Sequence, residues 1–208
     1  SHYINPGTVY YMGVLAEKGK HKAAIHTVGA SALGRMLIRY FKQKGIKLIN
    51  IVRKEEQIEE LKKEGADFVL NSQSPDFEAK LKELAEKESA TIAFDAIAGD
   101  FTAKILACQP PKSYIYAYVT LSGSPILSGI NRVELMKGKV VKVLFLPQYV
   151  KEVTEKGTVL EFKKEIHSLL PTVFKTHVQK VYNISDLKEA IEFYNKNSSK
   201  GKVLLKLN

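Results

Sequence analysis

The sequence has no tryptophan and a single cysteine, Cys108, among its 208 residues. One cysteine excludes an internal disulfide bond and any zinc site built from several cysteines, and it indicates a reducing compartment. No apolar run approaches the roughly 20 residues needed to span a membrane, and the first residues lack the basic and apolar regions of a signal peptide. We therefore expect a cytoplasmic location, or the mitochondrial matrix if an upstream transit segment is missing, and no membrane partner.

The sequence also has few histidines and no basic run with interleaved aromatic residues. Its five histidines show none of the His-x-x-x-His spacing by which a helix presents two ligands to zinc, so we expect no metal site. The net charge of +10 raises nucleic acid as a partner. Most lysines, however, alternate with glutamates, as in residues 54–63, which is typical of a solvated helix face. We therefore do not expect nucleic acid to be the main partner.

What the sequence does have is a regular alternation of strand-like and helix-like segments. Helical patterns over residues 32–44 and 55–64 are each ended by a glycine, and Ser74 is expected to cap a third helix. This alternation predicts right-handed crossovers and a doubly wound parallel sheet, that is, a Rossmann-type α/β fold of about six strands with helices on both faces. The predicted strands are residues 23–28, 46–52, 67–71, 90–95, 113–119 and 140–146.

We divide the chain into a lead-in, residues 1–22, and a nucleotide-binding domain, residues 23–208. In the lead-in, Asn5–Thr8 is predicted to form a turn and Val9–Leu15 an apolar helix. The predicted C-terminal elements are a helix at 158–170, an edge strand near 178–181, a helix beginning at Ser185 and a last strand at 202–207.

The first predicted strand runs into a turn of small residues and then directly into a helix. Small side chains let the backbone approach a phosphate, and the free N–H groups and dipole at the helix start favour its negative charge. The alternative is that small residues only let the helix pack close to the sheet. The candidate cofactor-binding residues of this turn are Gly29, Ala30, Ser31, Ala32, Leu33 and Gly34.

The end of the second predicted strand selects the cofactor in such folds, and here it carries Arg53 and Lys54. An acidic residue would bind the ribose 2′-hydroxyl of NAD, whereas arginine suits the 2′-phosphate of NADPH because its planar fork of donors matches phosphate. We therefore predict NADPH as the cofactor. The alternative is that Arg53 is a surface residue paired with Glu55 or Glu56.

Two polar residues lie within or at the end of predicted strands. Asp95 ends the fourth strand at the carboxyl edge of the sheet, where ligands bind in open α/β sheets, so it is a candidate cofactor-binding residue. Capping of the following helix is its alternative role. His26, in the first strand, is expected to be a packed and hydrogen-bonded core residue.

The sixth predicted strand, residues 140–146, would lie at one edge of the sheet and is almost wholly apolar. Such an edge leaves unpaired backbone donors and acceptors beside hydrophobic side chains, so it can pair with another strand. We expect a homodimer through this strand, with coverage of the edge by a C-terminal helix as the alternative.

Several motifs occur together in an order that resembles one family. They are Asn5-Pro6-x-Thr8, Thr27–Gly34, Asn50–Lys54, Gly65–Asn71, Phe94–Gly99 and Gly201–Leu204. Over nearly the whole chain they resemble the cofactor domain of medium-chain dehydrogenases/reductases, in the quinone oxidoreductase and enoyl reductase branch.

The resemblance implies a Rossmann domain that binds NADPH and takes part in zinc-independent hydride transfer to a quinone, enone or enoyl-type acceptor. It also implies that Thr8 lies near the cofactor, and that the loop with Val119 and Thr120 flanks the nicotinamide, as does the loop after Asp95. In this branch the protein mainly orients the cofactor, and we expect no catalytic residue within this chain.

The sequence departs from the family in two respects. We expect the N-terminal barrel-like domain, which supplies much of the substrate cleft in family members, to lie outside these 208 residues. We therefore expect the acceptor to bind through a missing domain and this chain alone to be inactive. In addition, Ser31 and Ala32 replace family glycines, and Ala98 replaces another. The alternative function is a non-catalytic nucleotide-binding or assembly module that has kept the fold.

Overall fold

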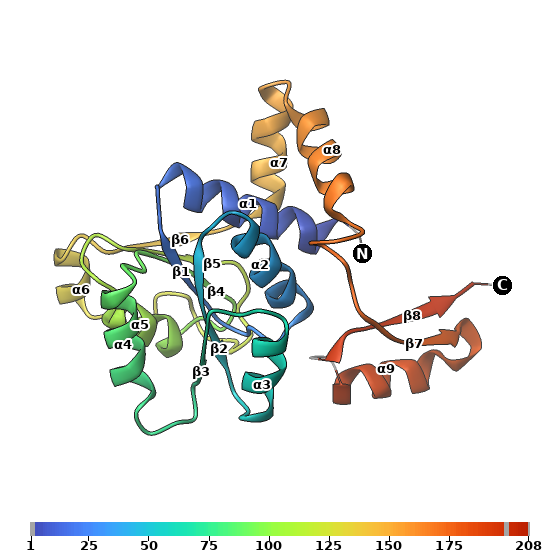
Figure 1. The fold of residues 1–208 in the computed structure, drawn as a ribbon, viewed down its shortest axis with the longest axis horizontal. Helices are drawn as coiled ribbons and strands as arrows, with labels where there is room; N and C mark the ends of the chain where they lie inside the picture. The colour runs from blue at the N-terminus through green and yellow to red at the C-terminus, as the bar shows by residue number, and fades with distance from the viewer. Residues whose placement is uncertain (1–2, 198–199, 208) are drawn as a thin grey trace.

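The computed structural model describes residues 3–197 and 200–207. Within these residues, a six-stranded parallel sheet forms the centre of the molecule, in the order β3-β2-β1-β4-β5-β6 (Figure 1). The direction of winding reverses between β1 and β4, as in the doubly wound fold, so the predicted fold class is confirmed. The strands are β1 (Ala23–His26), β2 (Lys47–Val52), β3 (Phe68–Asn71), β4 (Ile92–Asp95), β5 (Tyr114–Ala117) and β6 (Val140–Val143).

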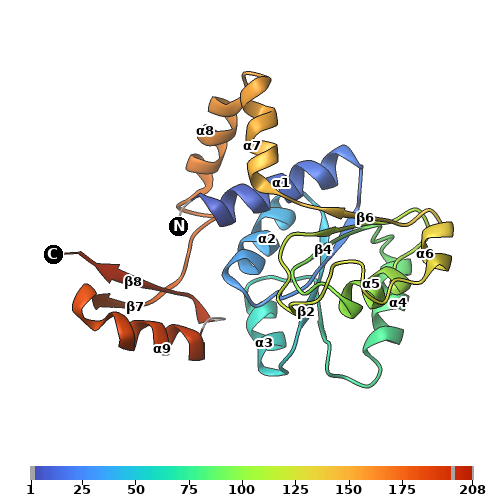
Figure 2. The ribbon, with the colours of Figure 1, turned by 180° about the vertical axis from the view of Figure 1, so that it is seen from behind.

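Helices cover both faces of this sheet (Figures 1 and 2). Successive residues of a strand point to opposite faces, so Ala24 belongs to one hydrophobic core and Ile25 to the other. Burial on both faces explains why the strands are nearly continuous apolar runs. The first face packs against α1 (Ile4–Lys18), α2 (Ala32–Gln43) and α3 (Glu56–Lys63), and the second against α4 (Phe77–Lys87) and α5 (Asp100–Cys108).

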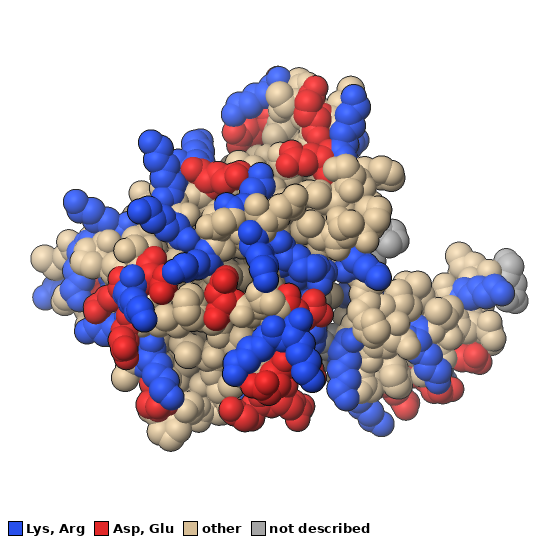
Figure 3. Space-filling view, viewed as in Figure 1, with Lys and Arg blue, Asp and Glu red and all other residues tan. Residues whose placement is uncertain are grey.

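The outer faces of the helices carry charges of both signs. Ion pairs such as Lys62–Glu59 at 2.9 Å join neighbouring helical turns, and Figure 3 shows basic and acidic side chains interspersed over the face in view. This is the solvated pattern that the alternating lysines and glutamates predict. No described helix combines the length and the apolar character that crossing a lipid bilayer requires.

The lead-in differs from the prediction at its start. Asn5–Thr8, predicted as a turn, lies in α1 directly after its first residue, and the Thr8 hydroxyl donates a hydrogen bond to the Ile4 carbonyl oxygen at 2.8 Å. Pro6 is tolerated because the first N–H groups of a helix have no intrahelical acceptor to lose. The predicted apolar helix at Val9–Leu15 is confirmed as the middle of α1.

Two further boundaries are wrong in the sequence prediction. Strand β6 ends at Val143 rather than at residue 146, and α7 (Leu146–Glu155) begins three residues later, with Pro147 in its first turn. Ser74 does not cap α4, which begins at Phe77, because its hydroxyl bonds the Asp76 carboxylate at 2.7 Å instead.

The C-terminal elements do not extend the main sheet. Among the described residues, β7 (Val178–Asn183) and β8 (Lys202–Lys206) pair in parallel with each other in a separate sheet, covered by α9 (Leu187–Asn197). We call β7, α9 and β8 the C-terminal unit. Figures 1 and 2 show it beside the core, beyond α3. The remaining elements are α6 (Arg132–Met136), α8 (Val159–Leu169), which packs with α7 against α1, and the short 3-10 helix Ile184–Asp186.

Candidate functional site

The turn between β1 and α2 lies where the winding of the sheet reverses. A Cβ atom on Gly34 would lie 2.2 Å from the Gly29 carbonyl oxygen, and one on Gly29 would lie 2.9 Å from Asn50 Cβ. These two glycines therefore let α2 pack close to the strands, as the alternative interpretation of the turn proposed. Val28 has a φ of 50°, which is unusual for a β-branched residue.

The start of α2 leaves backbone donors without acceptors. Ser31 is the N-cap, and its hydroxyl oxygen accepts a hydrogen bond from the Gly34 N–H at 3.0 Å. Within the described chain, no acceptor is recorded for the N–H groups of Ala32 and Leu33. Free N–H groups at a helix start favour an anion, so the turn can also serve the predicted function.

A cleft of about 200 Å³ opens beside this turn at the carboxyl ends of the strands. It brings Ala30 and Ser31 of the turn together with Arg53 at the end of β2. We call it the cofactor cleft. Its remaining lining residues are Val28, Ile51, Val52, Gln57, Ser72, Ile97 and Leu121.

The Arg53 side chain is exposed in this cleft. Among the described residues no carboxylate forms an ion pair with it, whereas Lys54 Nζ lies 3.5 Å from Glu56 Oε1. The Gln57 side-chain oxygen accepts hydrogen bonds of 3.2 Å from the backbone N–H groups of Arg53 and of Lys54, which fixes the start of α3. The pairing with Glu55 or Glu56 that would have explained Arg53 as a surface residue is therefore not formed.

Asp95 lies beneath the cleft rather than in it. Its carboxylate is fully buried and accepts hydrogen bonds from the N–H groups of Ile97 and Ala98, at 2.9 and 3.0 Å. The hydroxyls of Thr27 and Thr102 also donate to it, at 2.9 and 2.5 Å. A direct contact with a ligand would require these bonds to be given up. Asp95 is not the N-cap of the following helix α5 either, because that position is Gly99 and has no side-chain cap. Its carboxylate instead fixes the loop that carries Ile97 into the cleft.

The other candidate residues lie outside the lining of the cofactor cleft. Thr8 is nearly buried in α1 and bonded to its own helix. Val119 and Thr120 are exposed in the loop after β5, and the next residue, Leu121, lines the cleft. The structure thus brings together the turn, Arg53 and this loop, but not Thr8.

His26 is fully buried at the end of β1, directly before the turn. Its Nε2 lies 2.9 Å from the Tyr118 hydroxyl, at the end of β5, and burial lowers the pKa of His26 to about 3. The imidazole is therefore neutral at ordinary pH. The expectation of a packed, hydrogen-bonded core histidine is confirmed.

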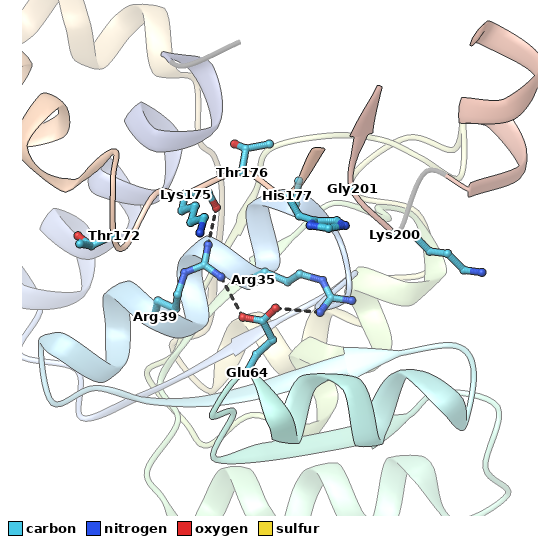
Figure 4. A pocket seen from close by; sticks show the side chains of 10 residues that line it. Arg35, Arg39, Glu64, Thr172, Lys175, Thr176, His177, Lys200 and Gly201 are labelled. Carbon is cyan, nitrogen blue, oxygen red and sulfur yellow. Dashed lines mark hydrogen bonds and ion pairs between the residues drawn. The ribbon is translucent and has the colours of Figure 1, made fainter. Parts of the chain in front are cut away.

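A second cavity, of about 260 Å³, lies along the outer side of α2 (Figure 4). The sequence analysis did not identify it. Arg35 and Arg39 form ion pairs with Glu64 at 3.2 and 3.0 Å, and Arg35 also pairs with Glu60 at 2.6 Å. The i,i+4 spacing of the two arginines on α2 and of the two glutamates, Glu60 on α3 and Glu64 directly after it, was the available signal. We call it the basic cavity; its other lining residues are Ala32, Thr172, Lys175, Thr176, His177, Lys200 and Gly201.

Arg39 also holds the segment that leads to the C-terminal unit. Its Nε donates to the Val173 carbonyl oxygen and one terminal nitrogen to that of Lys175, both at 2.8 Å. In Figure 4 the His177 side chain lies above Arg35, between Arg39 and Lys200. The basic cavity is thus formed where α2 meets two segments: the linker, residues 172–177, which leads into β7, and Lys200 and Gly201, which directly precede β8.

A doubly wound sheet with an anion-accepting helix start at its switch point defines a nucleotide-binding α/β domain. A model of the zinc-binding dehydrogenase family matches residues 32–175, and the chain belongs to this family. The predicted membership in the medium-chain dehydrogenase/reductase group is confirmed. The family takes its name from zinc binding. Within residues 3–197 and 200–207, however, no group of three or more histidine, cysteine or acidic side chains could hold a metal ion.

Known proteins similar to this chain are reductases. Quinone oxidoreductase 1 of Escherichia coli (strain K12) is 24% identical over 203 residues, which are 95% of this chain and 61% of that protein. A Mesorhizobium loti structure assigned as an NADPH:quinone reductase has a TM-score of 0.84 and 26% identity, over 99% of this chain and 59% of that one. The complex of Etr1p with NADP and crotonyl-CoA shares the fold, with a TM-score of 0.78 and 20% identity over 100% of this chain and 60% of that one. The chain therefore spans about three fifths of the length of these proteins.

Proposed function

We propose that this chain is the NADPH-binding part of a zinc-independent oxidoreductase that transfers hydride to a quinone, enone or enoyl-type acceptor. The observation that carries the proposal is the cleft shared by Arg53 and by Ser31, the N-cap of α2. Among the described residues the Arg53 guanidinium has no ion-pair partner, and the next two N–H groups of the chain after Ser31 have no acceptor. The named reductases among the similar proteins support the reaction class.

The two anion-attracting groups suit two different phosphates of one ligand. The N–H groups of Ala32 and Leu33 would hold the phosphates that join the two nucleotides, and Arg53 would bind the 2′-phosphate by paired charge-assisted hydrogen bonds. The cofactor, when bound, supplies the hydride, and the residues of this chain bind and orient it.

The basic cavity offers a second place where an anion could be attracted, on the other side of the turn between β1 and α2. Ala32 lines it together with Arg35, Arg39, Lys175 and Lys200. Two carboxylates, Glu64 in the lining and Glu60 paired with Arg35, offset these four cations, which leaves a net charge of +2 with histidine neutral. A cleft lined mainly by one sign of charge raises the local concentration of an oppositely charged ligand. We include Lys200 among the residues that attract the cofactor phosphates.

The C-terminal unit supports the expectation that a further domain holds the acceptor. A two-stranded sheet with one helix is marginal on its own, and this unit exposes an unusual number of large apolar side chains. We propose that a domain outside residues 1–208 covers this unit and that residues 1–22 lead from it into the nucleotide-binding domain. The exposed side chains are Val178, Val181, Ile184, Leu187, Ile191, Leu204, Leu205 and Leu207.

Calorimetry with the 208-residue chain tests the binding half of the proposal. We expect saturable 1:1 binding of NADPH and no quinone turnover, because substrate orientation alone can account for about 7–11 kcal/mol of barrier lowering. Absence of NADPH binding would overturn the proposal.

Fusion of this chain to the part of Escherichia coli quinone oxidoreductase 1 that it does not match tests the catalytic half of the proposal. Turnover would support an oxidoreductase, and binding without turnover would identify the non-catalytic module instead.

We also propose a homodimer through the edge of the sheet. Within the described chain β6 pairs only with β5, and Val143 and Phe145 beside it are 63% and 58% exposed. The C-terminal helices α7 and α8 pack against α1 rather than over this edge. Val143→Lys should give a monomer in sedimentation, whereas Leu160→Lys, on exposed α8, should not change the mass. A monomeric unmodified chain at high micromolar concentration would contradict this proposal.

A further inference from the structure

A groove of about 480 Å³ lies over β5 and β6 on the face of the sheet that carries α1. It is bounded by α1 on one side and by the start of α7 on the other. Its volume is within the range of small-molecule sites, about 300–1,000 Å³. It shares no lining residue with the cofactor cleft. We call it the tyrosine groove, after its lining residues Tyr11, Tyr114 and Tyr116.

The floor of the groove is aromatic. Tyr114 and Tyr116 occupy alternate positions of β5, so their side chains share one face of the sheet. Tyr11 forms a side wall, and its ring stacks on Tyr149 with 4.1 Å between centroids and 10° between planes. Phe145, exposed at the start of α7, closes the groove at the edge of the sheet. Flat rings held in fixed orientations offer a stacking surface for another planar ring.

A lysine is already positioned over this floor. Lys142 of β6 is paired in register with Tyr116, and its Nζ lies 5.3 Å from the Tyr114 ring centroid and 5.9 Å from that of Tyr116. These distances are in the range of cation–π contacts. The aromatic floor thus holds the ammonium group at the groove before any ligand arrives.

The positive charge of the groove is not balanced by its own carboxylate. Among the described residues, neither Lys142 nor Lys18, which also lines the groove, has an acidic partner. The carboxylate in the lining, Glu152, is paired with Lys156 at 2.6 Å. Burial raises the pKa of Tyr11 and of Tyr116, so both phenols stay protonated and neutral.

We propose that the tyrosine groove binds a small planar aromatic anion. The Lys142 ammonium, which lies over both rings, would turn toward the anionic group, and the ligand ring would take its place on Tyr114 and Tyr116. Pairing of β6 with a second copy of the chain would leave the groove open, because strand pairing takes place in the plane of the sheet while these side chains stand perpendicular to it. The proposal is independent of the cofactor cleft.

Fluorescence titration with 8-anilinonaphthalene-1-sulfonate, in the presence of saturating NADPH, tests the proposal. The matched neutral probe is N-phenyl-1-naphthylamine, which has the same rings without the sulfonate. We expect a single class of sites for the anion, and Lys142→Gln should weaken its binding by about tenfold or more, the loss expected of one charge-assisted contact. Lys188→Gln, on exposed α9, should leave the affinity unchanged.

A second variant and three outcomes make the test decisive. Tyr114→Leu removes a stacking surface while keeping an apolar side chain, and it should weaken both probes; circular dichroism checks its folding. Equal affinity of Lys142→Gln and the unmodified chain for the anion would overturn the proposal. So would equal affinity of the unmodified chain for the two probes, or binding of the anion only when NADPH is left out, which would put it in the cofactor cleft.

Discussion

The nucleotide-binding core and the C-terminal unit contain the same kinds of elements but bury very different parts of their surface. In the core, strands such as β1 and β4 are buried at every position. In the C-terminal unit, β7 buries Tyr182 and α9 buries Ala190, while most of their other side chains are exposed. The core has the two packed faces that make a parallel sheet stable. The C-terminal unit has one thin layer, an arrangement that is marginal on its own.

The largest difference between the two regions should appear in matched leucine truncations. Leu37 of α2 is 0% exposed, whereas Leu205 of β8 is 38% exposed. We expect Leu37→Ala to lower the free energy of unfolding by about 2–5 kcal/mol, the usual range for a buried leucine. Leu205→Ala should cost less than about 1 kcal/mol. Urea unfolding of both variants measures this, and equal losses would show that the C-terminal unit is packed as tightly as the core.

Cofactor preference should likewise depend more on the core than on the C-terminal unit. A charge-assisted hydrogen bond contributes about 1.5–3 kcal/mol, so NADPH should bind at least about tenfold more tightly than NADH. Arg53→Ala should remove most of this preference, and Lys200→Ala should weaken both cofactors without changing their ratio. Arg132→Ala, an exposed arginine on α6, is the matched control. Calorimetry that gave equal affinities for NADPH and NADH in the unmodified chain would contradict the role of Arg53.

The elements predicted correctly from the sequence were those with local causes. The turn from Gly29 to Gly34 and the glycines that end α2 and α3 are read from residue size and backbone freedom, without knowledge of distant contacts. The pairing of β7 with β8 depends instead on which sheet each strand reaches, which the alternation of strands and helices does not specify. The boundary errors at Asn5–Thr8 and at Ser74 have another cause, a choice between local hydrogen-bond partners: Thr8 bonds within α1, and Ser74 bonds Asp76.

The residues of the candidate site were likewise predicted where their positions follow from the local sequence and missed where they depend on contacts between distant segments. Arg53 was identified because its position follows from the end of β2, whereas the basic cavity was missed because Lys200 is far from Arg35 in the sequence. Asp95 was correctly placed at the carboxyl edge, but only the hydrogen bonds from Ile97, Ala98 and two threonines reveal that its carboxylate is occupied.

His26 should make the core sensitive to acid. Because burial lowers its folded-state pKa to about 3, the unfolded chain binds a proton that the folded chain does not, and stability falls as the pH drops below about 6.5. Between pH 7 and pH 5 this residue should cost roughly 2 kcal/mol of stability. His26→Gln should be less stable at neutral pH but show a flatter decline on acidification. A pH dependence of urea unfolding identical to that of the unmodified chain would exclude His26 as its cause.

The smallest effect should come from the contact that joins the two regions. Arg39 binds the carbonyl oxygens of Val173 and Lys175 from α2, and its side chain is only 26% exposed. Arg39→Gln should lower global stability by about 1 kcal/mol, since hydrogen bonds at a partly exposed site are discounted by water. Because the linker loses its anchor while both regions keep their own packing, proteolysis should increase mainly near residues 172–177. The control is Arg132→Gln, and an unchanged cleavage pattern in Arg39→Gln would mean that the linker is held by the packing of buried Phe174 rather than by Arg39.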